Sequence, residues 1–261
     1  MGKVIMPHDH QHVLGEYHIA GEKEINMAIE AAMAAKADWA ALRWEERAAI
    51  FLKAAELLAG KYRYLMNAIS MLSTSKSAYQ AEIDAACELI DFLRFNVYYA
   101  QQVYTDQPLY SSKGVWNFVQ QRPLEGFIFA VAPFNFTAIA GNLATSPAIM
   151  GNTVLLKPAS SCVYTPYLFM QILKEAGMPD GVINFVPGPG SMVGRLCLDH
   201  PDLGGIHFTG STGVFHQMWE TVGKNIARYK SYPRIVGETG GKDFIVAHKS
   251  ANVRKLVTGI V

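Results

Sequence analysis

Two side chains in this sequence could act on a carbonyl group, and each follows an apolar segment typical of a buried strand. Asn135 comes shortly after residues 127–131 and lies between Phe134 and Phe136. A side-chain amide at such a place can donate a hydrogen bond to a developing oxyanion, and losing such a donor lowers a rate roughly 10²–10³-fold. The alternative is that Asn135 only caps the helix after the turn. The local sequence leaves both interpretations open.

Glu238 is the second such side chain, and it has glycine neighbours, Gly237 before it and Gly240-Gly241 after it. Glycine allows a backbone to approach a ligand closely and to change conformation, so we expect the carboxylate to move. A glutamate can activate water or a thiol when burial raises its pKa toward neutrality. The alternative is a solvated turn residue that pairs with Lys242.

A lysine and a glycine-rich turn lie between these two positions. Gly188, Gly190 and Gly194 follow an apolar segment, and such a turn can direct backbone N–H groups at a phosphate. The motif alone is weak, because it is longer than the usual dinucleotide fingerprint and contains a proline. Lys157 ends another apolar segment, where it could donate hydrogen bonds to ribose hydroxyls or simply be solvated.

A second turn combines hydroxyl groups with glycine. It comprises Thr209, Gly210, Ser211 and Thr212, and it also follows an apolar segment. Hydroxyl and backbone N–H groups at the start of a helix suit a pyrophosphate. Ordinary capping of the helix explains the same residues equally well.

The segments that carry these residues predict a parallel β-sheet with helices on both faces. Short apolar segments alternate with helical ones, and this pattern indicates βαβ units with a doubly covered sheet. Ligands of such sheets collect beyond the carboxyl ends of the strands, where each of the polar motifs lies. The expected strands are 127–131, 153–156, 181–186, 206–208 and 234–236.

The first hundred residues predict helices instead. Apolar residues recur at helical spacing from Glu24 to Leu42 and from Trp44 to Ala59, and a further helix is expected from Lys76 to Gln102. We therefore expect a helical layer over residues 24–105. Residues 115–122 alternate in polarity, which predicts an edge strand within 112–123 that could serve subunit contact.

Composition narrows the classes of partner. The chain has 261 residues, half of them apolar, and a formal net charge of +1. It therefore lacks the basic field that nucleic acid binding requires. Residues 126–156 carry no charge, but prolines and asparagines interrupt them, so a buried strand–helix–strand unit explains them better than a membrane span. Small molecules and copies of the chain itself are the expected partners.

Cysteines and histidines give no separate site. Cys87, Cys162 and Cys197 have no regular spacing, which indicates a reducing compartment rather than disulfides. All three are expected in helical segments away from the strand ends, so none is assigned as a nucleophile. The histidines within residues 8–12 lack the further ligands that a metal site needs.

Taken in this order, the motifs resemble the aldehyde dehydrogenase superfamily from Glu24 to the end of the chain. A closer resemblance is to its Δ1-pyrroline-5-carboxylate dehydrogenase branch. Phe134 and Thr239 stand where general members of the superfamily carry tryptophan and leucine. The branch resemblance rests on Ala81-Glu82-Ile83-Asp84-Ala85-Ala86, Leu89-Ile90-Asp91-Phe92, Arg94-Phe95-Asn96, Leu124-Glu125-Gly126-Phe127, Pro133-Phe134-Asn135-Phe136-Thr137-Ala138-Ile139 and Gly237-Glu238-Thr239-Gly240-Gly241-Lys242.

The resemblance implies a role for each position. Asn135 matches the oxyanion donor, Glu238 the general base and Lys157 the lysine at the adenosine ribose. Ser160 stands where many NAD-using relatives have a glutamate that binds the ribose 2′-hydroxyl, so NAD is the implied cofactor and NADP stays open. The remaining implied cofactor contacts are Ala132, Gly188, Gly190, Gly194, Thr209, Gly210, Ser211, Thr212, Gly213 and Val214.

The resemblance also implies a fold and an activity. It implies an α/β fold, with a helical N-terminal layer on a Rossmann-type sheet over 126–249, and an incomplete dinucleotide-binding domain over 1–261. The catalytic domain and its cysteine nucleophile would follow Val261, so this chain alone is expected to be inactive. The full-length parent would oxidise glutamate γ-semialdehyde to glutamate in proline catabolism.

The parent would be a homo-oligomer in the bacterial cytoplasm or the mitochondrial matrix. Two alternatives stay open for its function. One is another aldehyde specificity, and the other is a non-catalytic dinucleotide-binding or structural protein.

Overall fold

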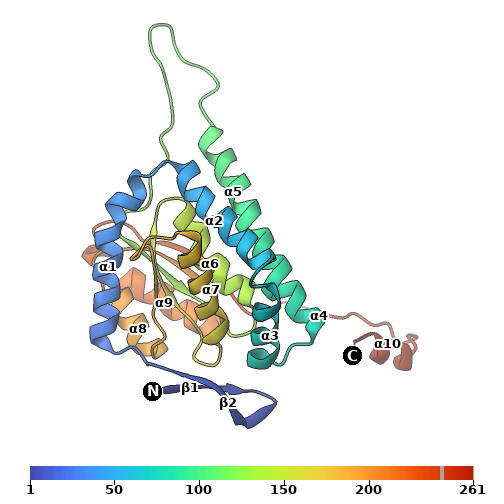
Figure 1. Cartoon of the computed structure of the whole chain (residues 1–261). Helices are drawn as coiled ribbons and strands as arrows, with labels where there is room; N and C mark the ends of the chain where they lie inside the picture. The colour runs from blue at the N-terminus through green and yellow to red at the C-terminus, as the bar shows by residue number, and fades with distance from the viewer. Residues whose placement is uncertain (242–243, 261) are drawn as a thin grey trace.

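A five-stranded parallel sheet forms the centre of the molecule (Figure 1). The computed structural model describes residues 1–241 and 244–260. The sheet confirms the predicted α/β class and places every expected strand, with end points that differ by a few residues. Its strands, in the spatial order β5-β4-β3-β6-β7, are β3 (Phe127–Val131), β4 (Thr153–Lys157), β5 (Ile183–Phe185), β6 (Leu203–Thr209) and β7 (Arg234–Glu238).

Both faces of the central strands β3, β4 and β6 are buried, which explains why these strands are mostly apolar, whereas the edge strand β7 is largely exposed. Successive side chains of a strand point to opposite faces. Phe127 and Phe129 of β3 accordingly belong to one hydrophobic core, whereas Ile128 and Ala130 belong to the other. Burying both faces removes apolar surface from water on each side, the main favourable contribution to folding.

Helices provide the two covering layers. Helices α1, α8 and α9 share one core with the sheet, while α2, α5, α6 and α7 share the other. The helices are α1 (Glu22–Ala41), α2 (Trp44–Ala59), α3 (Arg63–Thr74), α4 (Ala78–Ala81), the π-helix η1 (Glu82–Glu88), α5 (Leu89–Thr105), α6 (Thr137–Ile149), α7 (Tyr164–Ala176), α8 (Gly190–Leu198), α9 (Thr212–Lys224), the 3₁₀-helix η2 (Ile226–Arg228) and α10 (Val253–Ile260).

The expected helix from Lys76 to Gln102 is composite. It begins as α4, widens into the π-helix η1 and continues as α5. A π-helical segment is rare and often marks a functional site. Asp84 in this segment is 2% exposed, so the widened turn holds a carboxylate inside the molecule.

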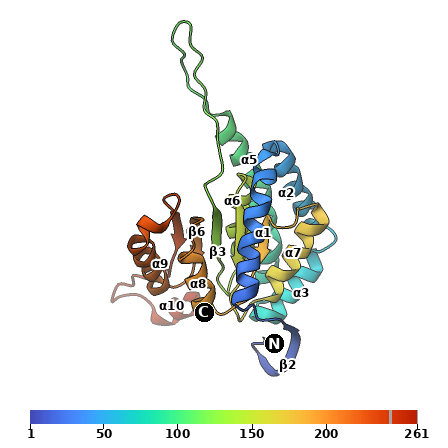
Figure 2. The ribbon, with the colours of Figure 1, turned by 90° about the vertical axis from the view of Figure 1, so that its left-hand side faces the viewer.

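The first residues of the chain form strands, so the helical prediction for the first hundred residues is wrong at their start. Strands β1 (Gly2–Met6) and β2 (Asp9–Tyr17) pair as an antiparallel hairpin. Gly2 lies opposite Tyr17, and a Cβ on Gly2 would come within 2.4 Å of that tyrosine ring. The missing side chain thus makes room for the ring, and the hairpin itself lies at the end of the molecule opposite the arm formed by residues 106–126 (Figure 2).

That arm, residues 106–126, contains no strand, so the predicted strand within 112–123 is wrong for this chain. The arm projects from the body in both views (Figures 1 and 2). Within the described residues, the side chain of Gln107, near the start of the arm, binds the backbone of Val119. It accepts from the Val119 N–H at 2.9 Å and donates to the Val119 carbonyl at 3.1 Å. A strand needs a neighbouring backbone to satisfy its own polar groups, and one glutamine cannot replace it.

The C-terminal part of the predicted βαβ region, 126–249, has a different character. The sheet ends at Glu238, and residues 244–252 contain no helix or strand before α10. No residue of α10 is buried. Across the described ranges, no helix combines the length and the apolar character needed to cross a membrane.

Candidate active site at the carboxyl edge of the sheet

A cavity of about 1200 Å³ lies at the carboxyl edge of the sheet. Strands β3 and β6 are neighbours at this point, but the helices that follow them, α6 and α9, pack on opposite faces. Such a reversal opens a crevice beyond the strand ends, which is where ligands of open parallel sheets bind. The topology alone therefore marks the same edge as the sequence motifs do.

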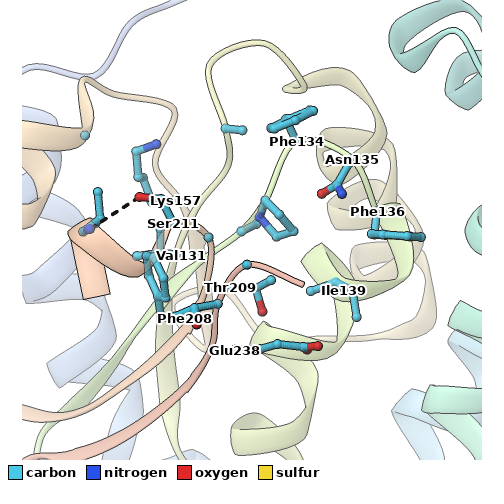
Figure 3. A pocket seen from close by; sticks show the side chains of 18 of the residues that line it. Val131, Phe134, Asn135, Phe136, Ile139, Lys157, Phe208, Thr209, Ser211 and Glu238 are labelled. Atoms are coloured by element: carbon cyan, nitrogen blue, oxygen red, sulfur yellow. Dashed lines mark hydrogen bonds between the residues drawn. The ribbon is translucent and has the colours of Figure 1, made fainter. Parts of the chain in front are cut away.

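Nine of the residues singled out from the sequence line this cavity. Figure 3 shows Asn135 and Glu238 toward one end of it, and Lys157 and Ser211 toward the other. The nine are Ala132, Asn135, Lys157, Gly190, Thr209, Gly210, Ser211, Val214 and Glu238. Five others lie outside its lining: Ser160, Gly188, Gly194, Thr212 and Gly213.

Asn135 belongs to the turn between β3 and α6. Its side chain is exposed, and no hydrogen bond from it is present among the described residues. The residue just before α6, at its N-cap position, is Phe136, which has no side-chain acceptor, and the first N–H groups of the helix are bound instead by the carboxylate of Asp84. The capping alternative for Asn135 is therefore wrong, and its amide is available to a ligand.

Lys157 is buried, in contrast to the solvated alternative. The residue is 9% exposed, and its Nζ donates to the Pro158 carbonyl at 2.8 Å. Burial lowers the pKa of this ammonium below its ordinary value. Within the described residues that carbonyl is its one acceptor, so the other N–H groups can bind acceptors on a ligand.

The glycines of the 188–194 turn have different tasks. A Cβ on Gly188 would come within 2.9 Å of Val193 and 3.0 Å of the Ala20 carbonyl, so this glycine permits close packing away from the cavity. Gly190 is the one that lines the cavity, and it begins α8. A Cβ there would lie 3.6 Å from Cε of Lys157, so the start of α8 and the lysine lie side by side.

The second turn serves its own helix and the cavity together. Ser211 is the N-cap of α9, and its hydroxyl accepts from Val214 N–H at 3.4 Å (Figure 3). The capping alternative for this turn is thus correct for Ser211, which nevertheless lines the cavity. Two helix N-termini, those of α8 and α9, consequently border the same space, and both favour negative charge.

Glu238 is held by the sheet rather than by a loose turn. It is the last residue of β7, pairs with Thr209, and its carbonyl accepts from Gly210 N–H at 3.1 Å. A Cβ on Gly237 would come within 2.3 Å of the Phe215 ring, so that glycine is needed for packing. Gly237 is therefore explained by packing, the movement of this backbone stays a prediction, and the side chain of Glu238 is exposed.

Two features expected of Glu238 have separate outcomes. The expected burial of its carboxylate is not observed, because Glu238 is exposed in this chain. Its alternative partner, Lys242, lies outside the described residues. The position thus offers a carboxylate at the mouth of the cavity.

Sequence reasoning missed several lining residues, including Glu88, Ser191 and Gln217. Burial raises the pKa of Glu88, and the nearby carboxylate of Asp84 raises it further. Helical spacing could have found Gln217, which is three residues after Val214 and so shares its face of α9. Glu88 gave no such signal, since it reaches the cavity from η1 through tertiary packing alone.

None of the three cysteines lines the cavity. Cys87 is exposed on η1, and Cys197 is buried on α8, where burial strongly raises the pKa of its thiol. Cys162 is buried in the turn after β4 rather than in a helix, so its predicted placement is wrong, and burial raises its thiol pKa as well. A reactive thiolate needs the opposite, a lowered pKa and access to substrate.

The arrangement can bind a ligand with phosphates at one end and polarise a carbonyl at the other. Lys157 and two helix N-termini supply donors for hydroxyl and phosphate oxygens, while Asn135 supplies a donor and Glu238 a carboxylate in the lining of the same cavity. Within the described part of the chain, no three histidine, cysteine, aspartate or glutamate residues gather as metal ligands.

Comparisons with known proteins agree with this geometry. A model of the "Aldehyde dehydrogenase family" matches residues 2–261. A probable delta-1-pyrroline-5-carboxylate dehydrogenase of Schizosaccharomyces pombe is 49% identical over 100% of this chain and 48% of its own length. The mitochondrial enzyme of that name from Homo sapiens is 44% identical over 98% of this chain and 45% of its own length.

A solved structure gives the same result. The delta-pyrroline-5-carboxylate dehydrogenase of Mycobacterium tuberculosis, bound with NAD, superposes with a TM-score of 0.93 at 56% identity, over 98% of this chain and 48% of that one. The chain thus spans about half the length of the relatives it matches. Several eukaryotic relatives are named mitochondrial.

Proposed function

Because the chain belongs to the aldehyde dehydrogenase family, we propose that the whole protein oxidises L-glutamate γ-semialdehyde to L-glutamate with reduction of NAD. The semialdehyde forms from Δ1-pyrroline-5-carboxylate, which places the reaction in proline catabolism. One observation carries the proposal: an amide, a carboxylate, a buried lysine and two helix N-termini line one cavity. Relatives named for this reaction that are 44–56% identical support the choice of substrate.

The phosphate and ribose end of the cavity fits a nicotinamide dinucleotide. The Lys157 ammonium has unused donors for ribose hydroxyls, and the N-termini of α8 and α9 suit the pyrophosphate. Ala132, after β3, lines the cavity, and we propose that its backbone contacts the nicotinamide end. When bound, NAD accepts the hydride. NADP is the alternative cofactor, because Ser160 supplies no carboxylate to bind a ribose 2′-hydroxyl.

At the other end, Asn135 and Glu238 act on the aldehyde and on water. Asn135 donates a hydrogen bond to the oxygen that becomes negative when a nucleophile adds to the carbonyl. Glu238 removes a proton from the water that releases the acid product. The two groups therefore serve successive halves of one reaction.

The attacking thiolate is proposed to come from a part of the protein outside this chain. Cys87, Cys162 and Cys197 do not line the cavity, and burial raises the pKa of two of them. We accordingly regard residues 1–261 as part of a dinucleotide-binding domain that works with a separate catalytic domain.

The proposal extends to assembly and location. The arm carries exposed apolar side chains, among them Leu109, Trp116 and Phe118, which would be covered in a homo-oligomer. The protein would reside in the cytoplasm of a bacterium or, as the names of eukaryotic relatives indicate, in the mitochondrial matrix.

The test is NADH formation from Δ1-pyrroline-5-carboxylate by the whole protein, beside a panel of other aldehydes. We expect the semialdehyde to have the highest kcat/KM, and this chain alone to bind NAD without turnover. Preference for another aldehyde would replace the substrate, and binding without any turnover by the whole protein would favour a non-catalytic dinucleotide-binding role. NADPH formation at equal efficiency would replace the cofactor assignment.

A further inference from the structure

The N-terminus of α6 lacks a cap of its own. A helix begins with N–H groups that have no partner within the helix, and the residue before it normally supplies an acceptor. Here that residue is Phe136, and the hydroxyl of Thr137 is buried without a hydrogen bond among the described residues. The acceptors must therefore come from elsewhere in the molecule.

The carboxylate of Asp84 supplies two such acceptors. One carboxylate oxygen accepts from Thr137 N–H at 2.9 Å, and the other accepts from Ala138 N–H at 2.9 Å. The side chain of Asp84 is 3% exposed, so these bonds are shielded from water. Hydrogen bonds to an ionised acceptor are roughly twice as strong as neutral ones, and two in a fork fix orientation as well as position.

Lys76 completes the anchor. Its ammonium forms an ion pair with Asp84 and lies 4.7 Å from the centre of the Phe136 ring. One cation thus neutralises the buried carboxylate and also holds the residue next to Asn135 through a cation–π contact. Both attachments act on the turn that carries Asn135 and leave its own amide free.

We propose that Asp84, with Lys76, is a positioning residue for Asn135 in the reaction proposed above. The anchored N–H groups belong to the second and third residues after Asn135, so moving them moves the amide that faces the carbonyl. A displacement of 1 Å in a catalytic group can lower a rate about 10²-fold. The π-helix η1 serves this purpose by bringing a carboxylate to the start of α6.

A double-mutant cycle in the whole protein tests the proposal. The variants are Asp84→Asn, Asn135→Ala and the two together, and kcat and the KM for NAD are measured for each. Asp84→Asn should lower kcat about 10- to 100-fold and change the KM for NAD less than about 3-fold. In the Asn135→Ala background the same change should lower kcat less than about 3-fold, because a group that acts through Asn135 has nothing left to position.

Glu82→Gln is the matched control, since Glu82 lies on the same π-helix, pairs with Arg63 and Asn67, and has no hydrogen bond or ion pair to α6 among the described residues. It should change kcat less than about 2-fold. If Asp84→Asn does not fold, Asp84→Glu keeps the charge and shifts the carboxylate, and the same cycle applies. An equal loss of kcat in both backgrounds would overturn the proposal.

Amide hydrogen exchange separates this proposal from the proposed function. In Asp84→Asn, or in Asp84→Glu if that variant is used, protection of residues 137 and 138 should fall at least about 10-fold relative to Glu82→Gln, while the central strands keep theirs. Unchanged protection would overturn the anchoring role even in an active enzyme. Lost protection in a protein that oxidises no aldehyde would instead reject the proposed function.

Discussion

Asn135 and Glu238 lie on one cavity but are held there in different ways. Glu238 ends a strand, and the hydrogen bonds of the sheet fix its backbone through Thr209 and Gly210. Asn135 lies in a turn that is fixed by Asp84, a buried carboxylate from a distant helix. A strand end positions a residue through local pairing, whereas a turn depends on whatever side chain reaches it. The two groups should therefore respond differently to substitution.

The largest effect is expected at the sheet-held position. Glu238→Gln in the whole protein should lower steady-state turnover about 10²–10⁴-fold, the usual contribution of a general base. Because the base serves the release step, one equivalent of NADH per site should still form in a rapid burst. Stopped-flow absorbance measures both phases. Loss of the burst as well would show that Glu238 acts before release and would remove the proposed division between the two groups.

Asn135→Ala should give the next largest effect, on the rapid burst in which the first equivalent of NADH forms. Loss of an oxyanion donor should lower the burst rate about 10²–10³-fold, which corresponds to about 3–4 kcal/mol of barrier. The exposed Asn26 on α1 provides the matched control, Asn26→Ala. A slow release step with a normal burst would assign Asn135 a different role.

Gly237→Ala tests how the sheet holds Glu238. A Cβ there would meet the Phe215 ring, which is stacked on Phe208 and cannot easily turn away. We expect the free energy of unfolding, measured in urea, to fall by about 1–3 kcal/mol. Gly240→Ala is the control, because a Cβ there meets none of the described residues within 4 Å. Equal stability of the two variants would contradict the packing role of Gly237.

The smallest expected effect is a pH dependence of the free energy of unfolding. It involves a histidine bonded to α6, the helix that follows Asn135. His207 of β6 donates from Nδ1 to the Leu143 carbonyl of α6 at 3.0 Å, and burial lowers its pKa below the ordinary 6.5. At His207 the unfolded chain then binds a proton more readily than the folded chain does. The stability contributed by the neutral imidazole is therefore present above its ordinary pKa and is lost as pH falls through the lowered pKa of the folded state.

Urea unfolding between about pH 7 and pH 5 measures this effect. His207→Gln should flatten the slope of stability against pH, whereas the exposed His216→Gln should leave it unchanged. A slope that survives in His207→Gln would assign the acid sensitivity to another group.

Much of the fold was readable from the sequence because it depends on short-range patterns. Apolar strands alternating with helices predicted the sheet, and α2 was predicted with the bounds that the structure has, Trp44–Ala59. The hairpin β1–β2 was missed because its longer strand, β2, is largely exposed and begins with four polar residues. The predicted arm strand failed because no strand among residues 1–241 and 244–260 pairs with it.

The candidate site shows the same division between short-range patterns and long-range packing. Residue order alone indicates that Asn135, Lys157 and Glu238 lie at or just after strand ends, and parallel strands place their carboxyl ends at one edge. Long-range packing, in contrast, brings Asp84 to the turn of Asn135 and Glu88 to the cavity. Those contacts join residues about fifty positions apart through packing against α6, and no local pattern of residue types encodes such a distance.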